Sequence, residues 1–421
     1  MKNKQWDLLA LASIPLVMTL GNSMFIPVLP VMEKKLDISN FQSSLIITVY
    51  SITAIILIPI AGYLSDKFGR KKIIIPSLII TAAGGALSAY AAWKMKDPYM
   101  MIIAGRFLQG IGASGAFPVV IPTVGDMFSD EEEVSKGLGL IETANTFGKV
   151  LSPIVGALLA AVIWFIPFAS IPVLSIGAAL LVMFLVRPPK EQEKEKKLVF
   201  SNFLKSVKTT FKENGRWLGG IFFIGGINMF ILFGFLFHLS SVLEDRYKIE
   251  GVIKGGVLAV PLLFLCTASF LIGKKIGSNK LLMKWGIFSG NAMAALPLFF
   301  IKENSSLLLL LLFLTISGTG IGISLPCLDA LLTEGIKKEE RGTITSLYSS
   351  MRFIGVAAGP PAVAAVIKVL PEMIYPGMGG IGIVGSLTAL FFIKPDKSPS
   401  QQDSNNALDH LDPVKGLAPK K

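Results

Sequence analysis

The chain has 421 residues, of which 52% are hydrophobic and only 16% are charged, and its mean hydropathy is +0.64. Soluble domains carry about 25% charged residues, so this composition excludes a soluble domain and indicates an integral membrane protein. The net charge of +12 does not indicate a nucleic-acid partner, because the basic residues gather in loops between apolar segments, as they do on the cytoplasmic side of membrane proteins.

About twelve apolar segments reach the length of about 20 residues that a helix needs to cross a bilayer. The first segment is too long for a signal peptide, and further segments follow it. The pattern predicts an all-α membrane protein with twelve transmembrane helices. The segments lie at residues 7–32, 40–64, 73–93, 99–127, 135–160, 163–186, 216–242, 252–273, 281–301, 306–333, 342–367 and 373–393.

A polar stretch at 187–215 divides these segments into two sets of six and indicates a cytoplasmic linker. It separates a first half at 1–186 from a second half at 216–394, and a polar tail at 395–421 is expected to be disordered. Residues repeat between the halves at a constant offset of 207, which predicts two pseudo-symmetric halves around a central site at mid-membrane. The matching pairs are Glu133 and Glu340, Gly148 and Gly355, Ser152 and Gly359, and Pro153 and Pro360.

A short basic loop joins the second and third segments. Gly62 allows two helices to approach closely, Gly69 permits a tight turn, and Asp66 is a fixed anion that needs an Arg or the positive end of a helix as its partner. Such loops mark the cytoplasmic side, so we expect both termini in the cytoplasm, with about 28 of the 40 Lys and Arg on that side and about 9 outside. The loop reads Gly62-Tyr63-Leu64-Ser65-Asp66-Lys67-Phe68-Gly69-Arg70-Lys71-Lys72.

The fourth segment carries a basic residue inside the membrane. A charge there is costly unless it faces protein or water, and such charges are mostly functional. We therefore favour a role for Arg106 in tuning a proton site or holding substrate over a structural ion pair. Asp126 ends the same segment on the cytoplasmic side. Arg106 lies in the stretch Gly105-Arg106-Phe107-Leu108-Gln109-Gly110-Ile111-Gly112-Ala113.

The fifth segment places Glu142, Asn145 and Lys149 at positions i, i+3 and i+7, on one face of a helix. A carboxylate beside a cation in a membrane span can gain and lose a proton as a cavity opens and closes, so Glu142 is the first candidate for the proton carrier. Small residues and a proline on this segment allow close packing or a kink; they are Gly148, Ser152, Pro153 and Gly156.

The second half supplies Asp329 in the tenth segment, as the second candidate proton carrier, and Arg352 in the eleventh. Arg106, Lys149 and Arg352 are the basic residues placed within spans, against the acids Glu142 and Asp329. A central site with more basic than acidic side chains favours a polar or anionic substrate.

The sequence contains no motif for ATP hydrolysis and no cysteine pattern for metal binding. No Walker loop is present, so an ion gradient rather than ATP is expected to drive the protein, and no cofactor or enzymatic activity is predicted. Cys266 and Cys327 fall in separate apolar segments and give neither a metal-binding pattern nor a disulfide.

Three of these motifs resemble those of the major facilitator superfamily of transporters. The loop at 62–72 is similar to its G-x-L-x-D-R/K-x-G-R-K pattern, and the fourth segment is similar to its R-x-x-Q-G-x-G-A motif. The fifth segment resembles G-x-x-x-G-P-x-x-G-G, the motif of its drug–proton antiporters with twelve spans. Ser152 and Ala157 depart from that motif, since both stand where the pattern has glycine.

The resemblance implies a conformational latch on the cytoplasmic face. It implies that Asp126 pairs with Arg70, and that Asp66 lies near the start of the eleventh segment, around Arg341–Thr345. The residues of the implied latch are Gly62, Asp66, Gly69, Arg70 and Asp126.

Within this family the chain is similar to the bacillibactin exporters of bacilli, which export an acidic catecholate siderophore. The resemblance implies proton-coupled efflux of a siderophore-like or other polar or anionic metabolite by a monomeric protein, with protons, a small molecule and the lipid bilayer as partners. A multidrug exporter of lipophilic cations is an alternative, and a lipid flippase or non-transport receptor is another. The similar stretches are Ala12-Ser13-Ile14-Pro15-Leu16-Val17-Met18-Thr19-Leu20-Gly21-Asn22-Ser23, Gly148-Lys149-Val150-Leu151-Ser152-Pro153 and Ser349-Ser350-Met351-Arg352-Phe353-Ile354-Gly355-Val356-Ala357.

Overall fold

Every regular element in the described part of the chain is a helix. Counting the first span as one, the described residues include 11 helices that are long and apolar enough to cross a membrane. The predicted tail at 395–421, and residues 187–199 of the predicted linker, lie outside the described residues. The structure is a computed structural model that describes residues 4–128, 131–186, 200–276, 279–302, 304–336 and 338–393.

The first span is built from three helical pieces. α1 (Gln5–Ser23) ends before η2 (Ile26–Val28), a single 3-10 turn, and α2 (Leu29–Leu36) completes the span. Pro27 and Pro30 stand in the first turns of η2 and α2, because a proline lacks the N–H that a continuing helix would donate. The other spans of the first half are α3 (Asn40–Phe68), α4 (Arg70–Lys94), α5 (Tyr99–Met127), α6 (Glu131–Val162) and α7 (Ile166–Leu185).

The second half differs from the predicted boundaries in two places. α8 (Phe200–Asp245) begins inside the predicted linker and continues without a break through the seventh span. α10 (Lys280–Ala295) is too short to span a membrane alone and is extended by the 3-10 turn η3 (Leu296–Phe300), which has Pro297 in its first turn. The remaining elements are α9 (Gly251–Lys275), α11 (Leu307–Gly335), α12 (Lys338–Ile367), η4 (Pro371–Met373) and α13 (Ile374–Phe392).

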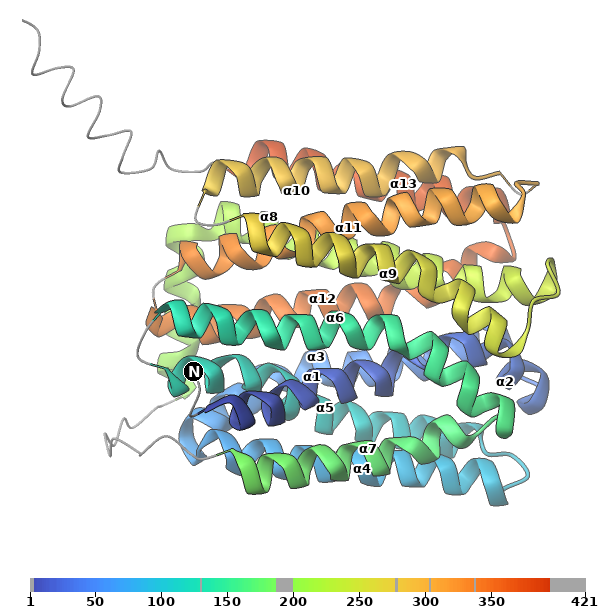
Figure 1. Cartoon of the computed structure of the whole chain (residues 1–421), viewed down its shortest axis with the longest axis horizontal. Coiled ribbons are helices and arrows are strands. Elements are labelled where there is room, and N and C mark those ends of the chain that lie inside the picture. Colours follow the sequence, from blue (N-terminus) through green and yellow to red (C-terminus); the bar gives the residue numbers. More distant parts are fainter. Residues whose placement is uncertain are drawn as a thin grey trace, which may run out of the picture.

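The long helices lie side by side, with α1–α7 in one half of the bundle and α8–α13 in the other (Figure 1). In the first half α1 packs on α6, α3 on α5, and α4 on both α5 and α7. The second half repeats these pairs, with α8 on α12, α9 on α11, and α10 on both α11 and α13. The same packing scheme therefore occurs twice, which is the pseudo-symmetry of the two halves.

The two halves meet along two helix pairs, α3 with α12 and α6 with α9. The bundle has two ends, the N-terminal end, where α1 begins, and the opposite end, where α2 lies (Figure 1). Side chains on α3, α6, α9 and α12 therefore make up most of the interface between the halves.

Glycines set the closest helix contacts in both halves. A Cβ atom on Gly84 would overlap the carbonyl oxygen of Gly105, so α4 and α5 touch through their backbones. Gly290 and Gly320 make the same kind of contact between α10 and α11. Without water or a strong hydrophobic drive between helices in lipid, such backbone approach supplies van der Waals packing.

Candidate functional site

The loop between α3 and α4 forms a charged cluster at the N-terminal end of the bundle. Gly69 has a φ of 99°, a conformation that glycine adopts without strain, and this residue turns the chain from α3 into α4. Arg70 forms an ion pair with Asp66, and its Nε lies 3.0 Å from Asp126 Oδ2. Arg70 also donates a hydrogen bond of 2.8 Å to Ser65 Oγ. The structure thus brings together three residues of the predicted latch from α3, α4 and α5.

The described part of this cluster belongs to the first half of the bundle. Next to it, α3 packs on α12 of the second half, and a Cβ added at Gly62 would lie 3.9 Å from Ser346 Oγ. We expect Asp66 near Arg341–Thr345; the side chains of Arg341 and Thr343 lie outside the described residues, so this part of the latch stays a prediction.

Arg106 is completely buried within the first half and does not line the cavity between the halves. Its guanidinium donates to the carbonyl oxygens of Ile46 at 2.6 Å and Gly21 at 2.9 Å. It also donates to Gln109 Oε1 and Asn22 Oδ1, both at 2.5 Å. Arg106 thus donates to neutral oxygens on α1, α3 and α5 rather than forming an ion pair, and its role in tuning a proton site or holding substrate stays a prediction.

Aromatic rings complete the surroundings of this guanidinium. Its central carbon lies 4.6 Å from the ring centroid of Tyr50 and 4.9 Å from that of Phe25, both within cation–π range. Neutral acceptors and π faces thus replace the carboxylate that a buried arginine often pairs with.

Three charged side chains from both halves meet near the centre of the bundle. Arg352 of α12 lies between two acids, with Nη2 at 3.6 Å from Glu142 Oε1 and Nη1 at 3.7 Å from Asp329 Oδ1. Glu142 belongs to α6 of the first half, and Asp329 belongs to α11 of the second. These distances exceed those of a good hydrogen bond, so Arg352 is shared loosely between the two carboxylates.

Asn145 connects this group to α1. Its Nδ2 lies 3.2 Å from both carboxylate oxygens of Glu142, and its Oδ1 accepts a 2.6 Å hydrogen bond from Thr19 Oγ1. The predicted helical face of Glu142 and Asn145 is therefore held by a side-chain network within the first half.

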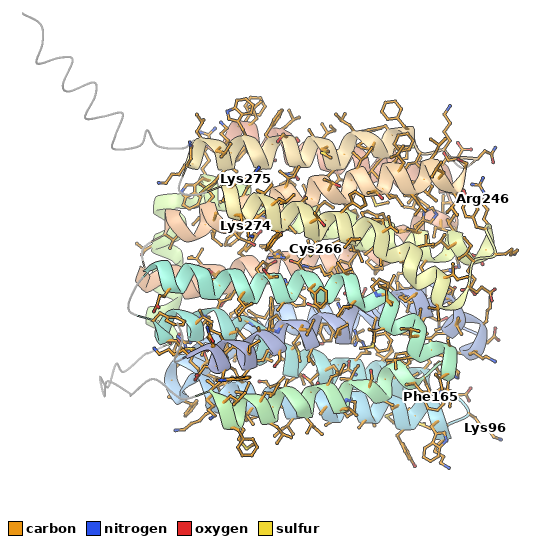
Figure 2. All side chains as sticks on the ribbon, in the orientation of Figure 1. Lys96, Phe165, Arg246, Cys266, Lys274 and Lys275 are labelled. Atoms are coloured by element: carbon orange, nitrogen blue, oxygen red, sulfur yellow. The ribbon has the colours of Figure 1, made fainter. Side chains whose placement is uncertain are left out.

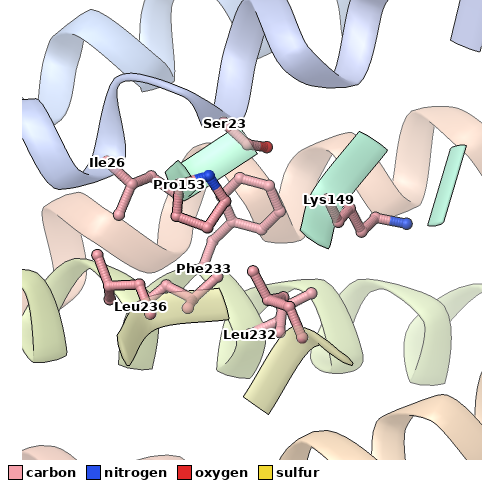
Figure 3. Close-up of a pocket in the computed structure, with 9 residues that line it drawn as sticks. Ser23, Ile26, Lys149, Pro153, Leu232, Phe233 and Leu236 are labelled. Carbon is pink, nitrogen blue, oxygen red and sulfur yellow. The ribbon is translucent and has the colours of Figure 1, made fainter. Parts of the chain in front are cut away.

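Lys149 lies two turns beyond Glu142 along α6, and its surroundings differ from those of Glu142 and Asn145. Its side chain is 6% exposed, and its Nζ has no hydrogen-bond partner in the described part of the chain. An ammonium can donate up to three hydrogen bonds, and none of these is satisfied by the described residues. In Figure 3 the Lys149 side chain extends away from Pro153, the residue one turn further along α6.

Lys149 borders a small cavity between the halves (Figure 3). The space holds little more than one water molecule, so a larger ligand requires the halves to separate. The apolar lining could not be predicted from the sequence, because every span is rich in such residues. The lining comprises Ser23, Ile26, Lys149 and Pro153 from the first half and Leu232, Phe233, Leu236, Leu258 and Leu262 from the second.

The small residues around Lys149 pack α6 against two partners. On one side a Cβ on Gly156 would overlap the Met24 carbonyl oxygen, and a Cβ on Gly148 would lie 3.2 Å from the Leu16 carbonyl oxygen, so α6 presses on the first span. Ser152 fits in the same contact, where its Oγ donates to the Gly148 carbonyl oxygen at 2.6 Å. Its hydroxyl occupies the place of a motif glycine without separating the helices.

The other side of this region of α6 meets the second half. A Cβ on Gly255 of α9 would overlap the Pro153 carbonyl oxygen and the Ala157 Cβ. The sequence analysis did not single out Gly255, because a glycine in an apolar span carries no signal of the helix that it touches.

The charges at the centre are balanced rather than positive. Arg352 and Lys149 face Glu142 and Asp329, since Arg106 lies elsewhere. Lys149 Nζ is the basic group at this cavity that has no hydrogen-bond partner among the described residues. Among the described residues, no group of His, Cys, Asp or Glu side chains is arranged to hold a metal ion.

Two six-helix halves with ionisable residues at their interface define a membrane transporter of the alternating-access type. The chain belongs to the Major Facilitator Superfamily, whose profile matches residues 11–360 and 284–417. It is a multi-pass membrane protein.

Relatives place the chain among exporters of this superfamily. It is 55% identical over 398 residues to the bacillibactin exporter of Bacillus subtilis (strain 168), with 94% of this chain and 98% of that protein covered. It is 26% identical to the class C tetracycline resistance protein of Escherichia coli over 82% of this chain and 86% of that protein. The crystal structure of the human organic anion transporter MFSD10 (TETRAN) has the same fold, with a TM-score of 0.74, 16% identity, and coverage of 92% of this chain and 99% of that chain.

Proposed function

We propose that this protein is a monomeric proton-coupled exporter of an anionic aromatic metabolite of the siderophore type. The observation that carries the substrate class is the Lys149 ammonium, which is buried and unpartnered beside an apolar cavity between the halves. A catecholate offers both an oxyanion for this ammonium and an aromatic ring for the Leu and Phe side chains. The 55% identical relative is named as a bacillibactin exporter, which agrees with this ligand chemistry.

The distribution of basic residues supports an orientation with both termini in the cytoplasm. Lys274 and Lys275 lie toward the N-terminal end of the bundle, whereas Lys96 and Arg246 lie at the opposite end (Figure 2). The loop from Lys67 to Lys72 adds further cations at the N-terminal end, and short cytoplasmic loops carry such an excess. The opposite end is then extracellular.

Proton coupling is assigned to the loose cluster of Glu142, Arg352 and Asp329. A carboxylate that gains a proton loses its attraction for the guanidinium, so protonation of Glu142 weakens a contact between α6 and α12. Asp329 then holds Arg352 within the second half. Protonation thus changes how strongly the two halves hold each other, which is what an alternating-access carrier needs to couple ion binding to opening.

A multidrug exporter of lipophilic cations is the second candidate, and the similarity to tetracycline and multidrug resistance proteins supports it. Its cation would have to approach Glu142 or Asp329, both of which share Arg352. The nearby Lys149 ammonium opposes such a ligand, so the geometry favours the anionic substrate. A lipid flippase or a receptor on the same fold would show no proton movement with either kind of compound.

The experiment that tests the proposal records proton movement in everted membrane vesicles that carry the protein and an imposed pH gradient. A catecholate siderophore should collapse the gradient and a lipophilic cationic dye should not. Lys149→Met should lose the siderophore response, and Lys149→Arg should retain part of it. Collapse by the dye alone, or a full siderophore response in Lys149→Met, would contradict the proposal.

A further inference from the structure

We propose that Lys34, Glu244 and Lys254 form a charged gate that closes the opposite end of the bundle, with Lys34 as the residue that releases when the halves separate. The inference rests on the proposed transport function and orientation, which make this end extracellular. It concerns residues that neither the substrate cavity nor the proton-coupling cluster contains.

The gate is a three-member ion cluster that crosses between the halves. Glu244 near the end of α8 accepts from both lysines, with Lys34 Nζ at 2.6 Å from Oε1 and Lys254 Nζ at 2.6 Å from Oε2. Lys34 belongs to α2 of the first half, while Glu244 and Lys254 belong to the second half. The bond from Lys34 to Glu244 is the one that joins the halves, so it favours closure at this end, while the bond from Lys254 keeps Glu244 paired within the second half.

The three residues of the gate differ in burial, and this difference identifies Lys34 as the residue that separates from Glu244 when the gate opens. The side chains of Glu244 and Lys254 are 2% and 1% exposed, whereas that of Lys34 is 62% exposed. A buried carboxylate left without a partner is strongly unfavourable, but Glu244 keeps Lys254 when the halves part. Lys34 returns to water at little cost. The cluster can therefore open and close without leaving a bare buried charge.

Lys34 is held in position by its neighbour on α2. Glu33 accepts hydrogen bonds from Asn40 Nδ2 at 2.8 Å and from Ser43 Oγ, which fix α2 to the start of α3. Asp37 ends α2 in the left-handed conformation with a φ of 51° and directs the chain back into α3. α2 thus forms a short arm that moves with the first half and carries Lys34 to Glu244.

A second contact closes the same end. Ser240 Oγ of α8 donates to the Ile26 carbonyl oxygen of η2 at 2.8 Å, and Ser240 is 1% exposed. Ser240 lies one turn of α8 before Glu244, directly beneath the cluster. Its side chain can reach water from this end only when the gate opens, so position 240 reports on the gate.

The test measures the opening of this end directly. Ser240→Cys is introduced with Cys266→Ser and Cys327→Ser, and its reaction with a membrane-impermeant maleimide is followed in intact cells that produce the full chain. Lys34→Met should raise the labelling rate by roughly two- to fivefold, the change expected from the loss of an ion pair whose lysine is largely exposed to water. Lys34→Arg should restore the slow rate, because it keeps the charge on α2.

Lys35→Met is the matched control, because Lys35 is exposed on the same helix and has no ion pair in the described part of the chain. It should label at the unaltered rate. Equal labelling in Lys34→Met and Lys35→Met would overturn the gate. Glu244→Gln is a poorer test, since it leaves Lys254 buried without its carboxylate and threatens folding.

This readout needs neither substrate nor a proton gradient, so its result is separate from that of the transport assay. Faster labelling in Lys34→Met without any siderophore response would support the gate and contradict the proposed substrate. A siderophore response with unchanged labelling would contradict the gate alone.

Discussion

Two buried cations in the first half have opposite surroundings, which makes Arg106 the candidate for a structural role and Lys149 the candidate for ligand binding. Arg106 donates to oxygens on α1, α3 and α5 and lies against two aromatic rings. Lys149 has no hydrogen-bond partner among the described residues. A satisfied buried polar group stabilises the fold, whereas an unsatisfied one calls for a ligand or water.

Arg106→Met should lower the stability of the protein. The substitution leaves the buried oxygens of Asn22 and Gln109 without their donor, which should reduce the free energy of unfolding by about 3 kcal/mol. Thermal unfolding of the detergent-solubilised protein measures the change. Phe107→Leu, on the half-exposed side of the same helix, should leave the melting temperature nearly unchanged. An unaltered melting temperature together with lost transport would instead support a direct role of Arg106 in transport.

The residues of the centre could be predicted singly from the sequence, but their partners could not. The spacing of Glu142 and Lys149 places both on one helical face, and the composition of α12 marks Arg352 as embedded. Which acid shares Arg352 depends on how α6, α11 and α12 meet, and this is set by packing far apart in the sequence. Lys254 was not predicted as an embedded basic residue, although it lies within the predicted span 252–273 and its side chain is only 1% exposed.

At the scale of the elements, α6 carries more of the residues proposed for transport than any other helix in the described part of the chain. One part of it carries Glu142 toward α12, the middle carries Lys149 at the cavity, and the part beyond Pro153 touches α9. α9 approaches there because Gly255 has no side chain. The contact lies on the same side of the cavity as the charged gate, so both are expected to close together.

Gly255→Leu should hold the opposite end of the bundle partly open. Its side chain would overlap Pro153 and Ala157, and overpacking of a tight contact costs about 1–3 kcal/mol. Transport should fall by about tenfold while maleimide labelling of Ser240→Cys rises. Gly256→Leu is the control, because a Cβ at Gly256 meets no heavy atom within 4 Å. Equal behaviour of the two variants would show that this helix contact does not matter for closure.

Most helices were predictable because each needs a long apolar run to span the bilayer. The places where these helices break or continue past the predicted boundaries could not be predicted from the sequence. The break between α1 and α2, the 3-10 turn after α10 and the extension of α8 into the linker are decided by local backbone geometry and by neighbouring helices. Apolar periodicity does not report on any of these, since all faces of a membrane helix are apolar.

At the scale of the whole molecule, the two halves are joined by contacts at three levels. The Glu142 and Arg352 pair lies near the centre, the Lys34 and Glu244 pair lies at the opposite end, and Gly62 meets α12 at the N-terminal end. The central cavity is too small for a siderophore while all three levels are closed. Export therefore requires that contacts at the two ends open in turn, and in the proposed mechanism the central cluster links that movement to proton binding.

The most direct measurement follows proton and substrate movement in the same reconstituted vesicles for the unaltered protein and Glu142→Gln. The unaltered protein should move a catecholate siderophore uphill when a proton gradient is imposed. Glu142→Gln should still exchange siderophore across the membrane but should neither move protons nor accumulate substrate, because its side chain cannot carry the proton. Glu372→Gln, an exposed carboxylate in η4, should behave like the unaltered protein. Uphill, proton-coupled transport by Glu142→Gln would contradict the account.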